Sequence, residues 1–356
     1  MNPRIASVET FVASYPVVGK FKFFKQPTRD TVVVKITDDA GRVGWGQSVP
    51  SPTWSYETIE TVRTTLDSHL APALVGLDPF DIDEVWRVMN RVIAPSFSTG
   101  QPICKAGIDL ALFDLTRGNL GPRAGAVTLS WTIDARTRDD VSESIADAHA
   151  RGYRNFNVKV GSDAAFDVEM CREIRRLAPD AFVWVDANGG YDPDTALAVA
   201  PQFADLGIAA LEQPLPANHL GGFRKLREQR ALPILMDEPI VSLADLRAFH
   251  ELDLLDGVAM KVSRCGGLSE SRRVVEYMRQ HGLLFFASGL TDPDLSLAAS
   301  LLLFSSCGLE RPAALNAPQF LSGSILKSPI VIDGDQAAVP TGSGLGVEVD
   351  EHSLRA

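Results

Sequence analysis

The chain has 356 residues, of which 45% are hydrophobic and 22% charged, and this size suits one large or two ordinary globular domains. Its net charge of −11 argues against nucleic acid or an anionic membrane as a partner, and no apolar run reaches the length of a membrane span. The N-terminus lacks the pattern of a signal peptide, and the four cysteines form no C-x-x-C pair, so we expect a cytoplasmic protein with reduced thiols.

Residues 1–125 predict an α+β domain. Residues 5–17 and 30–49 alternate apolar and polar side chains like antiparallel strands, and DDAG within the second of these stretches predicts a hairpin turn. Three helical patterns follow, and the first two are expected to begin at the capping residues Ser55 and Asp78.

Residues 126–322 follow a different repeating pattern. Apolar, β-branched runs alternate with amphipathic helical stretches about every 25 residues, which is the length of one strand and one helix. Eight such units predict an α/β fold of the (β/α)8 TIM-barrel type. Residues 323–356 are rich in glycine and polar side chains, and we expect this segment to return to the N-terminal domain and complete it as a cap on the barrel.

A charged residue lies at the end of five successive predicted strands: Lys159, Asp186, Glu212, Asp237 and Lys261. The carboxyl ends of barrel strands are where such folds carry their chemistry. Three carboxylates from adjacent strands repel one another unless a cation joins them. Oxygen ligands of this kind predict Mg²⁺, with Mn²⁺ as a substitute. The two lysines are expected to face each other across the barrel mouth.

These residue types favour proton transfer at the carbon α to a substrate carboxylate. A bound metal would stabilise the enediolate that forms when the proton leaves. A neutral lysine would take the proton, which requires a pKa lowered toward roughly 7–8. Two rival interpretations are a Schiff-base aldolase with Lys159 as nucleophile and a binding protein without catalysis.

Several motifs together resemble the enolase superfamily, and within it the muconate lactonizing enzyme branch of the mandelate racemase/muconate lactonizing enzyme family. They are TDDAGRVGWGQ, AGIDLALFDL, NVKVG, VDANGGY, LEQP, MDEP, KVSRCGGL and SGLGVEVD. Their order covers nearly the whole chain. The resemblance implies that the three carboxylates bind metal and that both lysines act as acid or base, as is usual in this superfamily. It adds Glu238 as a partner of Lys261, and it places Asn188 beside the metal.

The chain departs from the pattern of this branch at several positions. Asn157 stands where the branch usually carries a lysine, and we expect it to point inward and contact the substrate, because it lies two residues before Lys159. Gln47 replaces a usual glutamate. The eighth strand ends near Asn316 without the paired aspartates of dipeptide epimerases, and no histidine stands where mandelate racemases keep their base.

Four further residues are candidate substrate contacts. Trp131 is expected either to line the pocket or to fill the core, and Asp292 either to contact substrate or to cap a helix. Lys22 and Phe23 belong to the stretch GKFKFFK, which occupies the position of the loop that closes over substrate in this family. Its lysines and phenylalanines would suit an anionic, partly apolar small molecule.

The sequence therefore predicts a Mg²⁺-dependent enzyme that acts on a small-molecule carboxylate and assembles as a homo-oligomer. We rank racemase or epimerase of an amino-acid derivative first. A muconate-type cycloisomerase and a dehydratase of a hydroxy acid or hydroxyproline are the alternatives, since opposed lysines suit each of these reactions.

Overall fold

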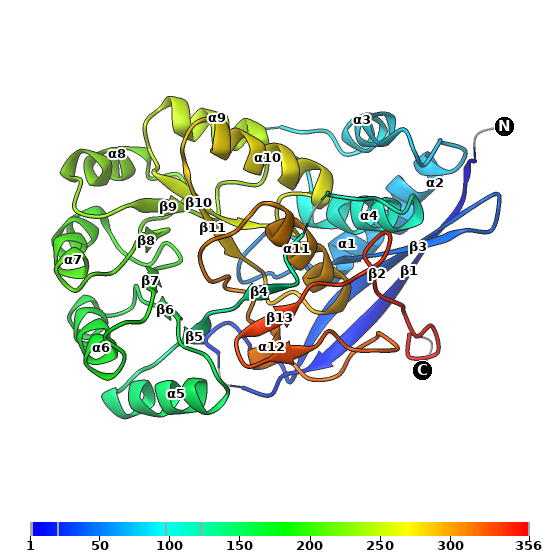
Figure 1. The fold of residues 1–356 in the computed structure, drawn as a ribbon. Helices are drawn as coiled ribbons and strands as arrows, with labels where there is room; N and C mark the ends of the chain where they lie inside the picture. The colour runs from blue at the N-terminus through cyan, green and yellow to red at the C-terminus, as the bar shows by residue number, and fades with distance from the viewer. Residues whose placement is uncertain (1–2, 20, 97, 122, 355–356) are drawn as a thin grey trace.

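The computed structural model describes residues 3–19, 21–96, 98–121 and 123–354 of the chain (Figure 1). Its N-terminal part is an antiparallel sheet in the order β1–β2–β3, followed by helices. These elements are β1 (Ile5–Pro16), β2 (Thr28–Asp38), β3 (Val43–Ser48), α1 (Ile59–Thr65), a π-helical turn (Leu66–Leu70), α2 (Ala71–Leu74), α3 (Ile82–Val92) and α4 (Pro102–Leu115). The N-caps of α1 and α3 are Thr58 and Asp81, so the predicted caps Ser55 and Asp78 lie too early.

The predicted hairpin between β2 and β3 is present. Asp38 Oδ1 accepts a hydrogen bond from the Arg42 amide at 2.8 Å, and Gly41 adopts a φ of 77°, which glycine tolerates best. Helix α4 packs directly on β3, because a Cβ at Gly46 would lie 2.0 Å from the carbonyl oxygen of Gly107. This packing fixes the start of α4 relative to the sheet.

The second part is a parallel sheet of seven strands in the order β11–β10–β9–β8–β7–β6–β5. The strands are β5 (Trp131–Ile133), β6 (Phe156–Lys159), β7 (Val183–Asp186), β8 (Leu211–Glu212), β9 (Ile234–Met236), β10 (Gly257–Lys261) and β11 (Leu284–Ser288). The sheet curls until its two edges meet a common segment, since Ala313 forms a parallel bridge with Leu129 and Ala314 forms one with Ser288. The predicted eighth strand is present only as these two isolated bridges.

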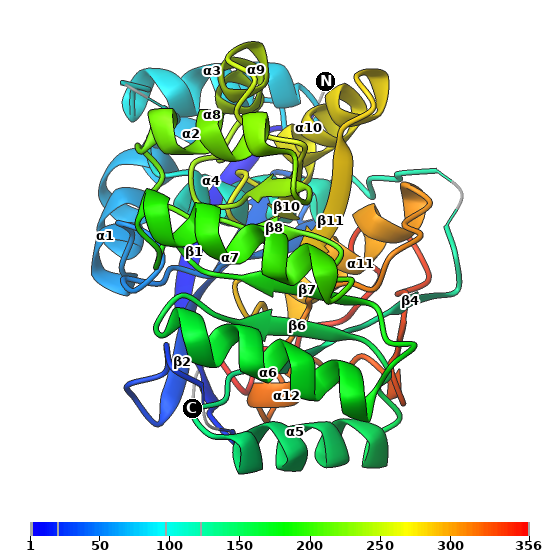
Figure 2. The same ribbon diagram turned by 90° about the vertical axis from the view of Figure 1, so that its left-hand side faces the viewer.

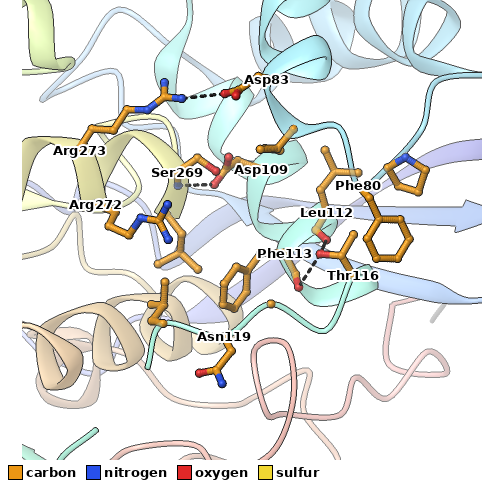
Figure 3. Close-up of a pocket in the computed structure, with 15 residues that line it drawn as sticks. Phe80, Asp83, Asp109, Leu112, Phe113, Thr116, Asn119, Ser269, Arg272 and Arg273 are labelled. Atoms are coloured by element: carbon orange, nitrogen blue, oxygen red, sulfur yellow. Dashed lines mark hydrogen bonds and ion pairs between the residues drawn. The ribbon is translucent and has the colours of Figure 1, made fainter. Parts of the chain in front are cut away.

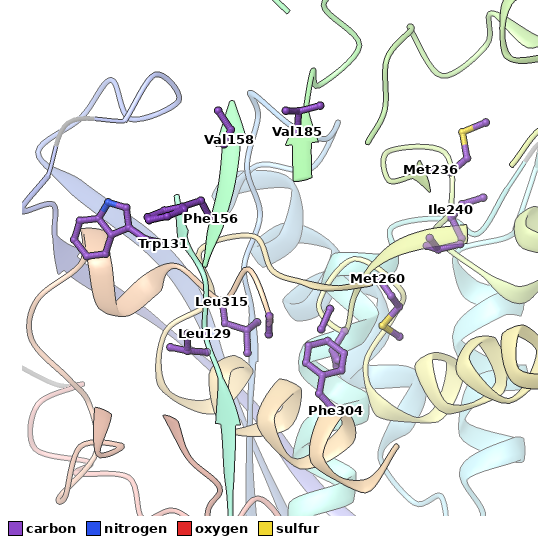
Figure 4. Close-up of a cluster of buried hydrophobic side chains, with 14 of the residues drawn as sticks. Leu129, Trp131, Phe156, Val158, Val185, Met236, Ile240, Met260, Phe304 and Leu315 are labelled. Atoms are coloured by element: carbon purple, nitrogen blue, oxygen red, sulfur yellow. The ribbon is translucent and has the colours of Figure 1, made fainter. Parts of the chain in front are cut away.

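Helices cover the outer face of this sheet (Figure 2). They are α5 (Arg138–Ala150), α6 (Ala164–Leu177), α7 (Pro193–Asp205), α8 (Leu220–Gln229), α9 (Leu243–Glu251), α10 (Leu268–Gln280) and α11 (Asp294–Ser306). Outward strand residues such as Phe156 and Val158 join the main buried core (Figure 4). The alternate positions Asn157 and Lys159 therefore face the inside of the curled sheet.

The C-terminal residues contact both parts of the molecule. The sheet β12–β13–β4 joins β12 (Ile332–Asp333) and β13 (Gln336–Ala338) to β4 (Ala126–Thr128), and the short helix α12 (Ala317–Phe320) precedes it. Glu351 forms an ion pair of 2.9 Å with Lys35 on β2, and the amide of Leu345 donates to Asp114 on α4 at 3.0 Å. In the described part of the chain, no helix combines the length and the apolar character needed to cross a bilayer.

Candidate active site

Five charged side chains lie at the carboxyl ends of consecutive parallel strands. Lys159, Asp186, Glu212 and Lys261 end β6, β7, β8 and β10, and Asp237 directly follows β9. The register pairs Lys159 with Asp186, and Asp186 with Glu212, so neighbouring side chains point to the same face. The Lys159 side chain is 9% exposed and the other four are less exposed.

The carboxylates of Asp186, Glu212 and Asp237 form one cluster, in which an oxygen of each lies within 4.8 Å of the others. Burial and the neighbouring Asp186 carboxylate raise the pKa of Glu212 well above its usual range. Burial alone would also raise the pKa of Asp186, but the ammonium groups of Lys159 and Lys261 hold it below its usual value. Glu212 Oε1 is buried and accepts no hydrogen bond from the described residues. Hard oxygen ligands this close together, one of them orphaned, fit a divalent cation.

Each lysine contacts a carboxylate of this cluster. Lys159 Nζ lies 2.5 Å from Asp186 Oδ2. Lys261 forms an ion pair with Asp237, and its Nζ lies 3.9 Å from Glu212 Oε1. Burial would lower the pKa of Lys159, but the carboxylates of Asp186 and Glu212 outweigh burial and raise it. The lowered pKa expected of a general base therefore requires a cation that offsets the carboxylate charge.

Arg264 is a charged neighbour of the cluster that sequence reasoning missed. Its guanidinium is 3% exposed and forms an ion pair with Asp237. It lies in the loop after β10, where neither strand nor helix periodicity places a side chain. Glu238 accepts a hydrogen bond of 3.2 Å from Asn188 Nδ2, and its carboxylate also interacts electrostatically with Lys261, the partner that the resemblance implied. Burial and the Asp237 carboxylate raise the pKa of Glu238 to about 7.

Trp184 was also missed, although the sequence carried a signal for it. It precedes Asp186 by two positions on β7 and so shares the inner face of the sheet. Its indole Nε1 donates a hydrogen bond of 2.9 Å to Glu212 Oε2. The ring is fully buried in a small cluster with Phe286 and alanines from the neighbouring strands, and it forms the floor beneath the carboxylates.

Both lysines line one small, closed cavity at the mouth of the curled sheet. Its volume is about 10 Å³, which is room for about one water molecule. The other side chains that line it include Asn157, Asn188, Asn316, Phe21 and Trp54. A substrate therefore needs the aromatic cover to move before it reaches the lysines.

This cover comes from the predicted loop and from the segment that follows β3. Phe21 stacks on Phe320 with ring centroids 4.6 Å apart, and Phe23 lies 4.2 Å from Trp54. Phe21 lines the closed cavity and also an open groove of about 800 Å³ beside α5. Phe21 therefore separates the lysines from the outside of the molecule.

Lys22 in the same loop supplies a cation close to the site. Its amide donates to Asp134 Oδ2 at 2.6 Å. Burial and the positive charge of Lys159 lower the pKa of Lys22, so the two ammonium groups interact. Lys20, another lysine of the predicted loop, lies outside the described residues.

Two of the predicted substrate contacts lie elsewhere. Trp131 Nε1 donates to Ser144 Oγ on α5 at 3.0 Å, so the indole packs on the outer side of β5. Asp292 accepts hydrogen bonds from Ser263 Oγ at 2.7 Å and from the Leu290 amide at 3.1 Å, so it holds the loop after β11. Neither residue is among those that line the closed cavity.

A separate hollow of about 340 Å³ lies between α3, α4 and α10 (Figure 3). Its rim carries an ion pair of 2.8 Å between Arg273 and Asp83, and Asp109 accepts a hydrogen bond from the Ser269 amide at 3.0 Å inside it. It shares no lining residue with the cavity of the lysines. The chemistry of the strand ends therefore does not extend to this hollow.

Two family models match this chain and together cover most of its length. The model of the mandelate racemase/muconate lactonizing enzyme N-terminal domain matches residues 8–121, and that of the enolase C-terminal domain-like family matches residues 140–353. The chain belongs to the mandelate racemase/muconate lactonizing enzyme family of the enolase superfamily. It is therefore an enzyme of this superfamily, and the family's divalent-metal chemistry agrees with the acidic cluster.

Relatives in the family are isomerases. A chloromuconate cycloisomerase of Cupriavidus necator is 29% identical over 99% of this chain and 98% of its own length. An N-succinyl-L-Arg/Lys racemase of Bacillus cereus is 23% identical over 99% of this chain and 97% of its own length. Among solved structures, a 2-chloromuconate cycloisomerase of Rhodococcus opacus has a TM-score of 0.90 at 26% identity and covers 99% of this chain and 98% of its own. The N-succinyl Arg/Lys racemase shares the fold with a TM-score of 0.91.

Proposed function

We propose that this enzyme moves a proton at the carbon α to a substrate carboxylate, with Lys159 and Lys261 as acid and base and with Asp186, Glu212 and Asp237 as metal ligands. The observation that carries the proposal is that three carboxylates form one buried cluster, and that the two lysines that line the closed cavity each form an ion pair with this cluster. Mg²⁺ at the carboxylates would stabilise the negative charge that develops on the substrate. The lysines hold or deliver the proton, and the aromatic cover excludes water.

Within this class we favour a cycloisomerase, in which a carboxylate adds to a double bond and one lysine delivers the α-proton. The support comes from relatives of 26–29% identity that are named chloromuconate or muconate cycloisomerases. The sequence alone had favoured racemisation of an amino-acid derivative, and the comparisons reverse that order.

Racemisation is the second candidate, because both lysines line the same cavity and come from strands on opposite sides of it. A racemase needs one lysine to remove the proton and the other to return it on the opposite face. A dehydratase has no such support among the relatives named above.

Single-lysine variants separate the two candidates. The measurement is α-hydrogen exchange in D₂O, followed by NMR with muconolactone and N-acyl amino acids. If the enzyme is a cycloisomerase, one of Lys159→Ala and Lys261→Ala should lose about 10²–10⁴-fold in rate, and the other should retain exchange. If it is a racemase, both variants should lose racemisation, and each should exchange only one enantiomer. Full exchange in both variants would contradict the proposed site.

We further propose Mg²⁺ as the cellular metal, a cytoplasmic location, a homo-oligomer, and a domain division at residues 1–125, 126–322 and 323–356. The four cysteines are free, which agrees with a reducing compartment. Size-exclusion chromatography with light scattering tests the oligomer directly, and a monomer at micromolar concentration would contradict it.

A further inference from the structure

Two amide side chains in the closed cavity carry polar atoms that the described structure leaves unpaired. Asn157 is 2% exposed and Asn316 is 7% exposed, and both line the cavity of the lysines. Asn157 Nδ2 and Asn316 Oδ1 are buried and have no hydrogen-bond partner among the described residues. An unpaired buried polar atom costs free energy and is rare in native proteins. The pair therefore indicates a ligand group that pairs with both atoms.

The two amides belong to one continuous wall, and Thr132 connects them. The register of β5 and β6 sets Thr132 directly beside Asn157. Asn316 Nδ2 donates a hydrogen bond of 3.2 Å to Thr132 Oγ1. The backbone of Thr132 is held in turn by Gln319, whose side chain accepts from its amide at 2.9 Å and donates to its carbonyl at 2.8 Å. Asn316 is therefore held in place before any ligand binds, and Asn157 lies beside its partner Thr132.

Thr132 and Asn316 lie across the curled sheet from the middle of the acidic cluster, whereas Asn157 lies on β6 beside Trp184 of β7, two residues before Lys159. Thr132 and Asn157 belong to β5 and β6, and Asn316 directly follows the bridging residues Ala313 and Ala314. The acidic cluster comes instead from the ends of β7, β8 and β9 in the middle of the sheet. A substrate whose reacting carboxylate lies at the cluster would extend its other end toward the amides.

We infer that the substrate carries a neutral hydrogen-bonding group at that end, an amide or a hydroxyl, and that Asn157 and Asn316 recognise it. The inference rests on the proposed proton transfer. Within it, the inference favours racemisation over the cycloisomerisation that the relatives support, because that cycloisomerisation needs a second carboxylate on the substrate. Asn157 Nδ2 requires an acceptor and Asn316 Oδ1 requires a donor. A secondary amide and a hydroxyl each supply both. A second carboxylate, as in muconate, supplies acceptors only and leaves Asn316 Oδ1 unpaired.

The expected ligand group depends on the orientation of the Asn316 amide, and a turn of 180° about its last side-chain bond exchanges the oxygen and the nitrogen. Its Oδ1 would then accept from the Thr132 hydroxyl, and its Nδ2 would join Asn157 Nδ2 as a second donor. Two donors suit a carboxylate. The experiment must therefore compare substrates that differ only in the presence of a donor.

Two matched pairs of compounds make this comparison with the Mg²⁺-loaded enzyme. Muconolactone is compared with its lactam, and an N-acetyl amino acid with the O-acetyl hydroxy acid of the same side chain. In each pair only N–H replaces O. The wild type should exchange the α-hydrogen of the N–H member at least about tenfold faster in kcat/KM. Asn157→Leu and Asn316→Leu should each reduce this preference to about twofold or less. Equal rates in the wild type, or a preference that persists in both variants, would overturn the inference.

Thermal unfolding of the substrate-free protein gives a readout that does not depend on activity. Asn157→Leu removes an unpaired polar atom, so its Tm should equal or exceed that of the wild type. Asn316→Leu is left out of this comparison because it also loses the hydrogen bond to Thr132. Asn155→Leu is the matched control, because Asn155 precedes the same strand and its Oδ1 accepts from the Phe182 amide at 3.1 Å. Its Tm should fall by several degrees. A similar fall in Asn157→Leu would show that this amide serves the fold, and it would contradict the inference.

Failure of the proposed function is separable from failure of the inference. If the wild type exchanges no compound of either pair, the proposed reaction is contradicted. Calorimetric binding of the same pairs with Mg²⁺ then decides the inference. Tighter binding of the N–H member, lost in both variants, supports it, and equal binding of the two members contradicts it.

Discussion

The indole nitrogen of Trp184 donates a hydrogen bond of 2.9 Å to Glu212 Oε2, and this bond orients a carboxylate that we propose as a metal ligand. Hydrogen bonds that orient ligands commonly change metal affinity by about 10–100-fold. Trp184→Phe should therefore weaken Mg²⁺ binding by about this factor, because Glu212 loses its only neutral donor among the described residues. Isothermal titration with Mg²⁺ measures the change.

A matched control is available at a carboxylate that is not part of the acidic cluster. Trp86 Nε1 donates a bond of the same length, 2.9 Å, to Asp109 Oδ1, beside the hollow of Figure 3. Trp86→Phe should lower the Tm and leave Mg²⁺ affinity unchanged. If the two variants weaken Mg²⁺ binding equally, the role given to Trp184 is wrong.

Glu57 anchors the segment that carries Trp54 over the cavity. Its carboxylate accepts hydrogen bonds from the amides of Ile103 and Cys104 at 2.9 and 2.7 Å. These amides open α4, whose N-cap Gln101 makes no side-chain cap. Glu57 therefore caps a helix from a distant segment, and it ties the aromatic cover to the N-terminal part of the molecule.

The buried carboxyl of Glu57 should make stability depend on pH. Burial, opposed by the two amide hydrogen bonds, raises its pKa from the ordinary 4.5 to about 7. The folded state then binds this proton more tightly than the unfolded state does. The stabilisation is fully present below about pH 4.5 and is lost as the pH rises through about 7. Between these values the free energy of unfolding should fall more steeply in the wild type than in Glu57→Gln. Urea titrations at several pH values test this, and identical slopes would refute the assignment.

The hydrogen bonds of Gln47 explain why a glutamine stands here in place of the glutamate that is usual in the family. Its Nε2 donates to Tyr15 OH at 3.0 Å and to Thr31 Oγ1 at 2.9 Å, while Tyr15 donates to Asp294 at 2.8 Å. A glutamate here would lose both donors and would bring a second carboxylate toward Asp294. Gln47→Glu should therefore lower the free energy of unfolding by about 1–3 kcal/mol at pH 7, and by less at pH 5, where the new carboxyl is partly protonated. Unchanged urea midpoints at both pH values would contradict this account.

The positions of the lysines and carboxylates could be predicted from the sequence because each ends an apolar strand, and parallel strands share one carboxyl edge. The inward direction of the Asn157 side chain could be predicted from the two-residue period of a strand, because Asn157 lies two residues before Lys159. The same period places Trp184 on the inner face of β7, two residues before Asp186. The orientation of Trp131 depended on which residue of a three-residue strand faces inward, and Thr132 takes that place.

Other features lay beyond sequence periodicity. Arg264 and Asp292 lie in loops, and their direction follows from long-range partners such as Asp237 and Ser263. The eighth strand was predicted from an apolar run, but only Ala313 and Ala314 form bridges there. Whether so short a segment pairs with strands on both sides depends on how the whole sheet curls, which a local pattern does not show.

The most direct test of the central claim is α-hydrogen exchange in D₂O, followed by NMR, with metal-depleted enzyme before and after Mg²⁺ is added. The matched compounds described above serve as substrates. We expect no exchange in excess chelator, full exchange once Mg²⁺ is restored, and none in Asp237→Asn at the same Mg²⁺ concentration. Full exchange in excess chelator, or undiminished exchange in Asp237→Asn, would contradict the metal-dependent proton transfer that the cluster of carboxylates and lysines supports.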